Sequence, residues 1–183
     1  SLKKTYSKIN NNTHLITNGF NDIEDTYANE NFGIIYSGVM KSSQNPKMLW
    51  KVLYEISKAN KSFRKDFSLK LIGSFDKSIH QNKHLKKLKE NVVFEDYMSK
   101  DTLAENLSIG KVFILCDVDQ LDGGNLIPGK FFHYLSYKIP IVAFSSIKSD
   151  TYNIVKETKS GNVFEFSNEI DLKNHILELY SNF

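Results

Sequence analysis

Short apolar runs alternate with amphipathic stretches along most of this chain of 183 residues. The runs have the length and continuity of strands that are buried on both faces of a parallel sheet. They predict strands at Gly33–Ser37, Ser68–Ile72, Val92–Phe94, Val112–Cys116, Ile139–Phe144 and Asn162–Phe166. The stretches between them repeat apolar residues at helical spacing, and they predict helices at Asn45–Lys58, Gln81–Lys89, Ser99–Leu107, Gly129–Tyr137, Asp150–Glu157 and Asn168–Tyr180. The repeated order of strand, helix and strand predicts an α/β fold, a Rossmann-like three-layer α/β/α domain with a parallel sheet of about six strands.

The loops that follow parallel strands lie at one edge of such a sheet, and ligands bind at that edge. The longest and most glycine-rich of these loops is Asp117–Gly129, and Lys130 follows it at the start of a predicted helix. Glycines let a ligand approach the backbone closely, and the first turn of a helix offers unpaired N–H groups to an anion. Together with the charge of Lys130, this arrangement suits a diphosphate. Gly38 and Gly73 follow the first two predicted strands and face the same edge.

The same region carries a family resemblance. The residues that match the family pattern lie in the loop, the helix and the next strand, and they are Pro128, Lys130, Phe132, Tyr134, Leu135, Pro140 and Ile141. Upstream, Ile16–Asn21 resembles the entry to the family's domain, and Phe32–Gly38 resembles its first strand and glycine turn. Through these matches, the segment 14–180 resembles the nucleotide-sugar-binding half of GT-B glycosyltransferases, the group-4-like retaining enzymes.

This resemblance implies transfer of a sugar from a nucleoside-diphosphate sugar to an acceptor hydroxyl, with retention and without a metal or other cofactor. It implies that residues 14–183 are the donor-binding domain and that residues 1–13 are a lead-in or interdomain stub. The sugar or glycan acceptor would be held by an N-terminal domain of the parent protein that is absent here, so we expect the fragment to bind donor without turnover. The implied setting is cytoplasmic polysaccharide biosynthesis, with room for peripheral membrane association of the parent.

The resemblance also assigns the candidate site residues. It gives the catalytic roles to Lys130 and Asn125. It gives donor binding to four glycines, a lysine and a histidine, namely Gly38, Gly73, Gly124, Gly129, Lys41 and His133.

Two features depart from the family pattern. Asn125 and His133 stand where the family has glutamates, the second of which accepts hydrogen bonds from ribose hydroxyls. Asparagine and neutral histidine can bond a hydroxyl, but without the strength of a carboxylate. Lys41 replaces one of two basic residues that the family places after the first glycine turn, and the arginine has no counterpart. Two alternatives therefore stay open: a catalytically degenerate domain with a non-catalytic binding role, and a GT-B nucleotide-sugar epimerase.

Composition and charge exclude several other classes of function. The net charge is +3 and the lysines are scattered, which argues against nucleic acid as a partner. The single cysteine, Cys116, excludes an intramolecular disulfide and indicates a reducing compartment. Asp117, Asp119 and Asp122 lack the rest of a calcium loop, so we expect a solvated loop there and no metal site. Zinc-ligand spacing, the Walker lysine loop and the full dinucleotide fingerprint are absent from the sequence.

Overall fold

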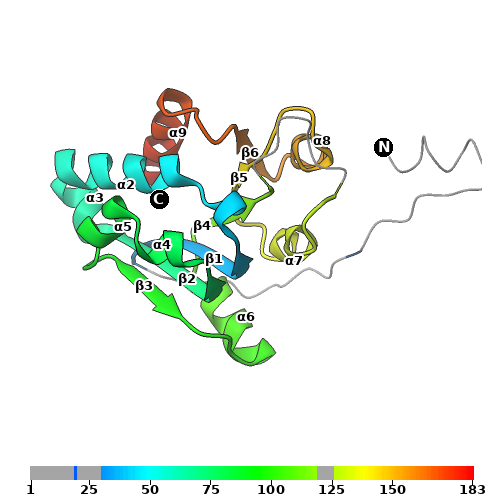
Figure 1. The fold of residues 1–183 in the computed structure, drawn as a ribbon, viewed down its shortest axis with the longest axis horizontal. Coiled ribbons are helices and arrows are strands. Elements are labelled where there is room, and N and C mark those ends of the chain that lie inside the picture. The colour runs from blue at the N-terminus through cyan, green and yellow to red at the C-terminus, as the bar shows by residue number, and fades with distance from the viewer. Residues whose placement is uncertain (1–18, 20–29, 119–125) are drawn as a thin grey trace, which may run out of the picture.

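The computed structural model describes residue 19 and residues 30–118 and 126–183. Helices cover both faces of a central sheet in this part of the chain (Figure 1). The sheet has six strands in the order β3-β2-β1-β4-β5-β6, and every neighbouring pair is parallel. The strands are β1 (Phe32–Met40), β2 (Phe67–Phe75), β3 (Val92–Glu95), β4 (Val112–Cys116), β5 (Ile141–Phe144) and β6 (Gly161–Phe164). The predicted strands and the Rossmann-like fold are confirmed, while the predicted lead-in, residues 1–13, lies outside the described residues.

The helices of the described residues agree with the six predicted ones, with three short additions: η1 (Ser42–Gln44), α3 (Lys61–Asp66) and α4 (Lys77–His80). The six that were predicted are α2 (Lys47–Ala59), α5 (Lys83–Lys87), α6 (Lys100–Ser108), α7 (Lys130–Leu135), α8 (Asp150–Thr158) and α9 (Ile170–Ser181). Two of the additions, α3 and α4, begin at side-chain caps: Asn60 accepts from the N–H of Phe63, and Asp76 accepts from that of Ser78. Within the described residues, no helix is long and apolar enough to cross a membrane.

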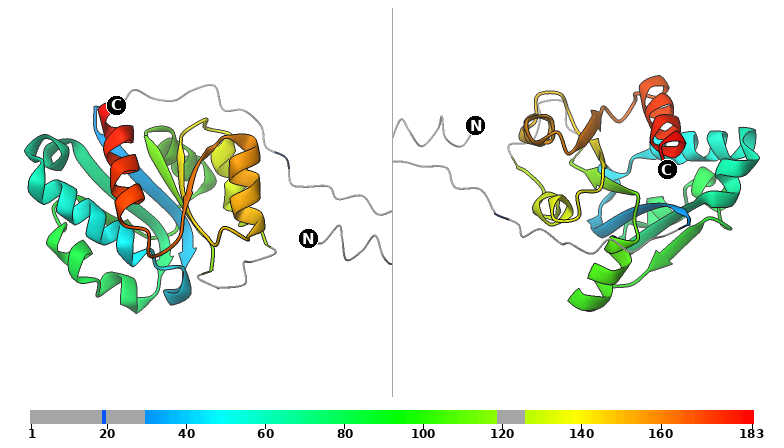
Figure 2. Two further views of the ribbon diagram at one scale, coloured as in Figure 1. Left: turned by 90° about the horizontal axis from the view of Figure 1, so that it is seen from above. Right: turned by 180° about the vertical axis from the view of Figure 1, so that it is seen from behind.

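The core is divided by the sheet into two clusters. One cluster joins the sheet to α2, α3, α4, α5 and α9, and the other joins it to α6, α7 and α8. Figure 2 shows the helices on either side of the sheet from two further directions. Successive side chains of a strand point to opposite faces, so Tyr36 of β1 belongs to the first cluster and Ile35 belongs to the second. The face on which a β1 side chain lies therefore decides which group of helices it meets.

Strand β1 pairs very differently with its two neighbours. It pairs with β2 along its whole length, from Phe32 opposite Phe67 to Met40 opposite Phe75. It pairs with β4 only at Ile34 and Ile35. The strand order reverses direction between β1 and β4, and the crevice beyond the carboxyl ends at such a switch point is where ligands bind in open α/β sheets.

Gly38 and Gly73 lie inside β1 and β2, where they face each other in register, and not in turns after the strands as the sequence predicted. Both have positive φ angles, 114° and 121°. A Cβ atom on Gly73 would lie 2.4 Å from the carbonyl oxygen of Gly38. The two strands can therefore continue side by side past this point only because one of them has no side chain there.

We expect Gly73→Ala to lower the free energy of unfolding by about 3 kcal/mol, because it adds both a positive-φ side chain and a backbone clash. Urea unfolding measures this change. Gly129→Ala is the matched control, since nothing lies within 4 Å of a Cβ at that position. If Gly73→Ala were as well tolerated as this control, the close approach of the two strands would be wrong.

Candidate functional site at the divergence of β1 and β4

The backbone of β1 finds new partners where β4 leaves it. The N–H of Lys111 donates to the carbonyl of Gly33, and alternate residues of a strand point the same way, so the N–H of Ser37 also faces the β4 side. That N–H donates to the hydroxyl of Tyr134 on α7, at 2.9 Å. The Ser37 hydroxyl lies 3.2 Å from the same atom. Helix α7 therefore closes the opening with a side chain where a strand no longer pairs.

Lys130, the first residue of α7, crosses the end of β1 to the other face of the sheet. Helix α7 packs with α6 and α8, whereas the Tyr36 ring packs with the α2 face. Even so, Nζ of Lys130 donates to the hydroxyl of Tyr36 at 2.7 Å and lies 3.8 Å from the centre of its ring. The ammonium thus combines a hydrogen bond and a cation–π contact on one aromatic residue.

Gly38 leaves the path of Lys130 open. A Cβ atom on Gly38 would lie 3.0 Å from Nζ of Lys130 and 3.4 Å from its Cε. Any side chain at this position would therefore crowd the ammonium that lies over the strand. The positive charge and the bare backbone stand next to each other, as a diphosphate requires.

Burial changes the acid–base properties of the groups around this ammonium. Burial lowers the pKa of Lys130 from its ordinary 10.5 to about 8. Burial raises the pKa of the Cys116 thiol to about 12 and that of Tyr134 to about 12. Burial also raises the pKa of Tyr36 well above its usual value. Lys130 is therefore the group of this cluster whose charge changes just above neutral pH.

The helix start contributes less to an anion site than the sequence predicted. Helix α7 spans six residues, shorter than the predicted Gly129–Tyr137, so its dipole is small. The N–H of Phe131 is already bonded to the carbonyl of Pro128, at 2.9 Å. The charge of Lys130 is consequently the main attraction for an anion here.

His133 lies one turn after Lys130 on α7. Its side chain is half-buried, its ring packs against Tyr137 with 5.5 Å between the ring centres, and Nε2 lies 3.5 Å from the Tyr137 hydroxyl. Burial, and secondarily the charge of Lys100, lowers the pKa of His133 below its ordinary 6.5. At neutral pH the ring is uncharged, with one nitrogen that donates and one that accepts.

Asp117, the residue after β4, is buried and not solvated, which corrects the prediction for the acidic cluster. Its Oδ2 accepts from the hydroxyls of Ser145, at 3.1 Å, and Thr151, at 3.0 Å, and its Oδ1 accepts from the N–H of Val118. The carboxylate fastens the start of the long loop to the beginning of α8. Asp119 and Asp122 lie outside the described residues.

The remaining predicted site residues have different positions. Lys41 is exposed just before η1, and Gly129 caps α7 with open space around it. Gly124 and Asn125 lie outside the described residues. Sequence reasoning missed the roles of Tyr36 and Tyr134 because both occupy positions that also suit plain core residues.

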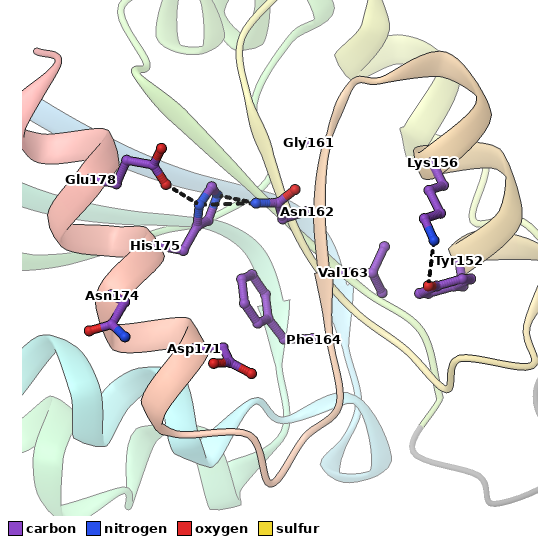
Figure 3. A pocket seen from close by; sticks show the side chains of 10 residues that line it. All are labelled: Tyr152, Lys156, Gly161, Asn162, Val163, Phe164, Asp171, Asn174, His175 and Glu178. Carbon is purple, nitrogen blue, oxygen red and sulfur yellow. Dashed lines mark hydrogen bonds and ion pairs between the residues drawn. The ribbon is translucent and has the colours of Figure 1, made fainter.

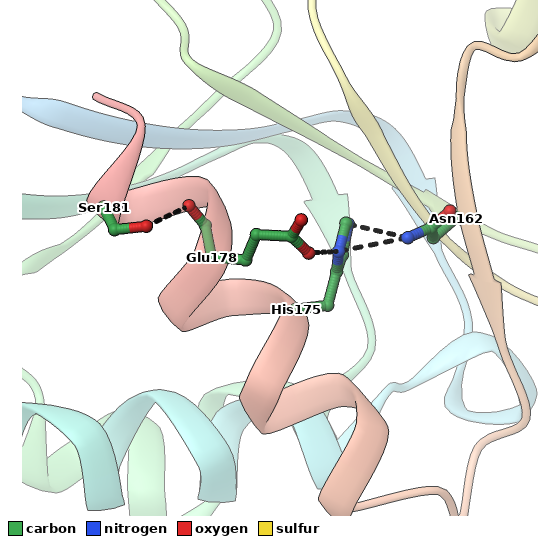
Figure 4. A network of polar contacts seen from close by, with 4 residues as sticks. All are labelled: Asn162, His175, Glu178 and Ser181. Atoms are coloured by element: carbon green, nitrogen blue, oxygen red, sulfur yellow. Dashed lines mark hydrogen bonds and ion pairs between the residues drawn. The ribbon is translucent and has the colours of Figure 1, made fainter.

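Two cavities lie elsewhere on the molecule. One, of about 420 Å³, runs along β6 between α8 and α9 (Figure 3). Its polar groups bond one another: Nδ2 of Asn162 lies 3.0 Å from Nδ1 of His175, which lies 3.4 Å from Glu178 (Figure 4). The other, of about 580 Å³, lies beside Lys138 and Thr158 where β5 and β6 begin, and it shares Gly161 with the first. Strands β4 and β5 separate β6 from β1, so the Figure 3 cavity lies apart from Lys130.

No group of three or more His, Cys, Asp or Glu side chains gathers as a metal site within residues 30–118 and 126–183. The site instead offers a partly buried ammonium from Lys130, an uncharged imidazole from His133, and the bare backbone of Gly38 at the switch point of the sheet.

Residues 31–182 match the family Glycosyl transferases group 1. The chain belongs to this family. A comparison with curated proteins gave no match. The domain is a glycosyltransferase domain with the Rossmann-like architecture of GT-B enzymes, as the resemblance predicted.

Solved structures of glycosyltransferases share this fold. The catalytic domain of cholesterol-α-glucosyltransferase from Helicobacter pylori is 20% identical, with a TM-score of 0.58 over 82% of this chain and 87% of that one. WaaG, a glycosyltransferase involved in lipopolysaccharide biosynthesis, is 11% identical, with a TM-score of 0.63 over 98% of this chain and 42% of that one. HepE from Anabaena, in complex with UDP, is 10% identical, with a TM-score of 0.62 over 84% and 40%. The chain therefore spans most of the first structure and less than half of the other two.

The partly buried ammonium of Lys130 should reduce the stability of this glycosyltransferase domain. Below pH 8 both the folded and the unfolded chain hold the Lys130 proton, and the folded state carries the whole cost of burial. Between pH 8 and 10.5 the folded state releases the proton first, so this cost shrinks. We expect Lys130→Met to raise the free energy of unfolding by roughly 1 kcal/mol at neutral pH, and by less as the pH rises through this window.

Chemical denaturation of both proteins at several pH values measures this difference. Lys41→Met is the matched control, because Lys41 is exposed. A stability gain for Lys130→Met that is the same at every pH, or no gain at all, would contradict the buried charge.

Proposed function

We propose that this domain binds a nucleoside-diphosphate sugar at the divergence of β1 and β4, and that its protein transfers the sugar to an acceptor hydroxyl. The observation that carries the proposal is the ammonium of Lys130 held over the bare backbone of Gly38. A departing nucleoside diphosphate gains negative charge as its bond to the sugar breaks. A fixed positive charge at that place stabilises the transition state more than the ground state.

In this proposal Lys130 neutralises the leaving group, so the reaction needs no metal ion. Gly38 and Gly73 let the phosphates approach the strands closely. His133, uncharged at neutral pH, hydrogen-bonds a ribose hydroxyl from the next turn of α7. Transfer proceeds with retention, as the resemblance implies, and the acceptor and any general base are supplied from outside this domain. The proposed setting is polysaccharide assembly in the cytoplasm.

Nucleotide binding tests the donor site directly. Isothermal titration of the chain with UDP, GDP and ADP should show binding of one of them, which identifies the base. Lys130→Ala should weaken that binding about tenfold or more, because it removes a charge-assisted hydrogen bond to phosphate. Lys65→Ala, an exposed lysine on α3, should bind as the wild type does.

Magnesium is the second arm of this titration, and it should leave the affinity unchanged. Binding that requires magnesium would overturn the metal-independent mechanism. Binding that is insensitive to Lys130→Ala, or no binding at millimolar nucleotide, would overturn the proposed site.

A degenerate, non-catalytic domain is the second candidate, and His133 is the observation that favours it. The pKa of this residue is lowered by burial, so at neutral pH it offers the ribose neither a carboxylate nor a charge. We expect His133→Glu to bind the nucleotide about fivefold more tightly, because a carboxylate accepts stronger bonds from ribose hydroxyls. His133→Gln is the matched neutral control.

The gain from His133→Glu should disappear with the 2′,3′-dideoxy form of the nucleotide, which lacks both hydroxyls. A gain of this kind identifies a weakened but intact ribose site. Equal affinities for His133→Glu, His133→Gln and the wild type would instead favour the degenerate domain.

A further inference from the structure

Tyr36 lies at the centre of the site, but it takes no part in the proposed transfer of the sugar. Its side chain is fully buried, and its ring packs 5.9 Å from that of Phe75. Its hydroxyl donates to the carbonyl of Val39 and accepts from the ammonium of Lys130, at 2.7 Å. Because the single hydroxyl proton goes to Val39, the oxygen lone pairs are directed toward Lys130.

The two partners differ in stiffness. Tyr36 has two side-chain torsions and lies in a packed core, while Lys130 has a flexible four-carbon stem and is partly exposed. A flexible ammonium occupies one place only when a rigid partner fixes it there. The hydroxyl and the ring face of Tyr36 both contact the ammonium, and the crossing over Gly38 fixes the direction of approach.

We propose that Tyr36 is the positioning residue for Lys130, which it holds over Gly38 with N–H groups left free for the diphosphate of the donor. An ammonium has three N–H groups, of which the Tyr36 hydroxyl takes one. This inference rests on the proposed function, because only the proposed donor supplies a phosphate for Lys130 to bind. It assigns Tyr36 no contact with the donor itself.

The hydroxyl also acts on the charge of Lys130. A hydrogen bond that the ammonium donates favours the protonated form, so Tyr36 opposes the effect of burial. The Cys116 thiol and the Tyr134 hydroxyl add no negative charge at neutral pH, because burial raises the pKa of both groups. The Asp117 carboxylate, next to Cys116, is bonded to Ser145 and Thr151. Removal of the Tyr36 hydroxyl should therefore lower the pKa of Lys130 further.

The test is Tyr36→Phe in the full chain, which keeps the ring and its packing. NMR of lysine side chains labelled at the terminal carbon and nitrogen measures the pKa of Lys130 without ligand. We expect it to fall by about one pH unit. Titration with UDP, GDP and ADP around pH 8, the region of the Lys130 pKa, should show that Tyr36→Phe binds roughly fivefold more weakly than the wild type. As the pH is raised, the affinity of Tyr36→Phe should begin to fall at a lower pH than that of the wild type. Combined with Lys130→Ala, Tyr36→Phe should cost nothing further.

Tyr180→Phe is the matched control, because its hydroxyl also donates a hydrogen bond, to Asp66, away from the site. If Tyr36→Phe leaves both the Lys130 pKa and the nucleotide affinity at wild-type values while Lys130→Ala still weakens binding, the inference is overturned and the proposed function stands. If Lys130→Ala binds nucleotide as the wild type does, the proposed function is overturned, and the inference falls with it. A loss in Tyr36→Phe that adds fully to that of Lys130→Ala would also overturn the positioning role.

Discussion

A strand inside a parallel sheet has hydrogen-bonding groups on both sides, and each group needs a partner once it is buried. In this domain β1 keeps its partner on the β2 side to the end and loses its partner on the β4 side after Ile35. The hydroxyl of Tyr134 satisfies the N–H of Ser37 in place of a strand. This substitution fixes where α7 begins, and therefore where Lys130 can reach. The opening for a ligand and the position of Lys130 thus both follow from the part of the β1 edge that β4 leaves unpaired.

The early end of the β1–β4 pairing also explains which residues surround the opening. Lys130 must pass from the α7 face to the α2 face, so the strand that it crosses can carry no side chain at Gly38. Gly73 is needed in turn because the carbonyl of Gly38 lies against it. Asp117 holds the other side by tying the end of β4 to α8 through Thr151. Small residues, a buried carboxylate and a buried cation form one continuous arrangement around the switch point.

The sequence predicted the strands well because fully buried parallel strands leave a simple signal, a continuous apolar run between polar stretches. It failed where the deciding contact joins distant residues. The sequence predicts a turn at Gly38 because a lone glycine after an apolar run usually ends a strand, and only pairing with β2 shows that the strand continues. Tyr36 and Lys130 are far apart in the chain, and neither residue type reveals that they meet. The sequence does not show that Asp117 is buried, because its hydroxyl partners, Ser145 and Thr151, come from beyond β5.

The lowered pKa of Lys130 has a consequence outside sugar transfer. Because burial lowers the pKa of Lys130 to about 8, a larger share of its side chain is the free amine near that pH than for an exposed lysine. The free amine is the nucleophile that attacks acylating and sulfonylating reagents, and the Lys130 side chain is only partly buried. A covalent probe that reacts with this amine would therefore report when the opening between β1 and β4 is occupied.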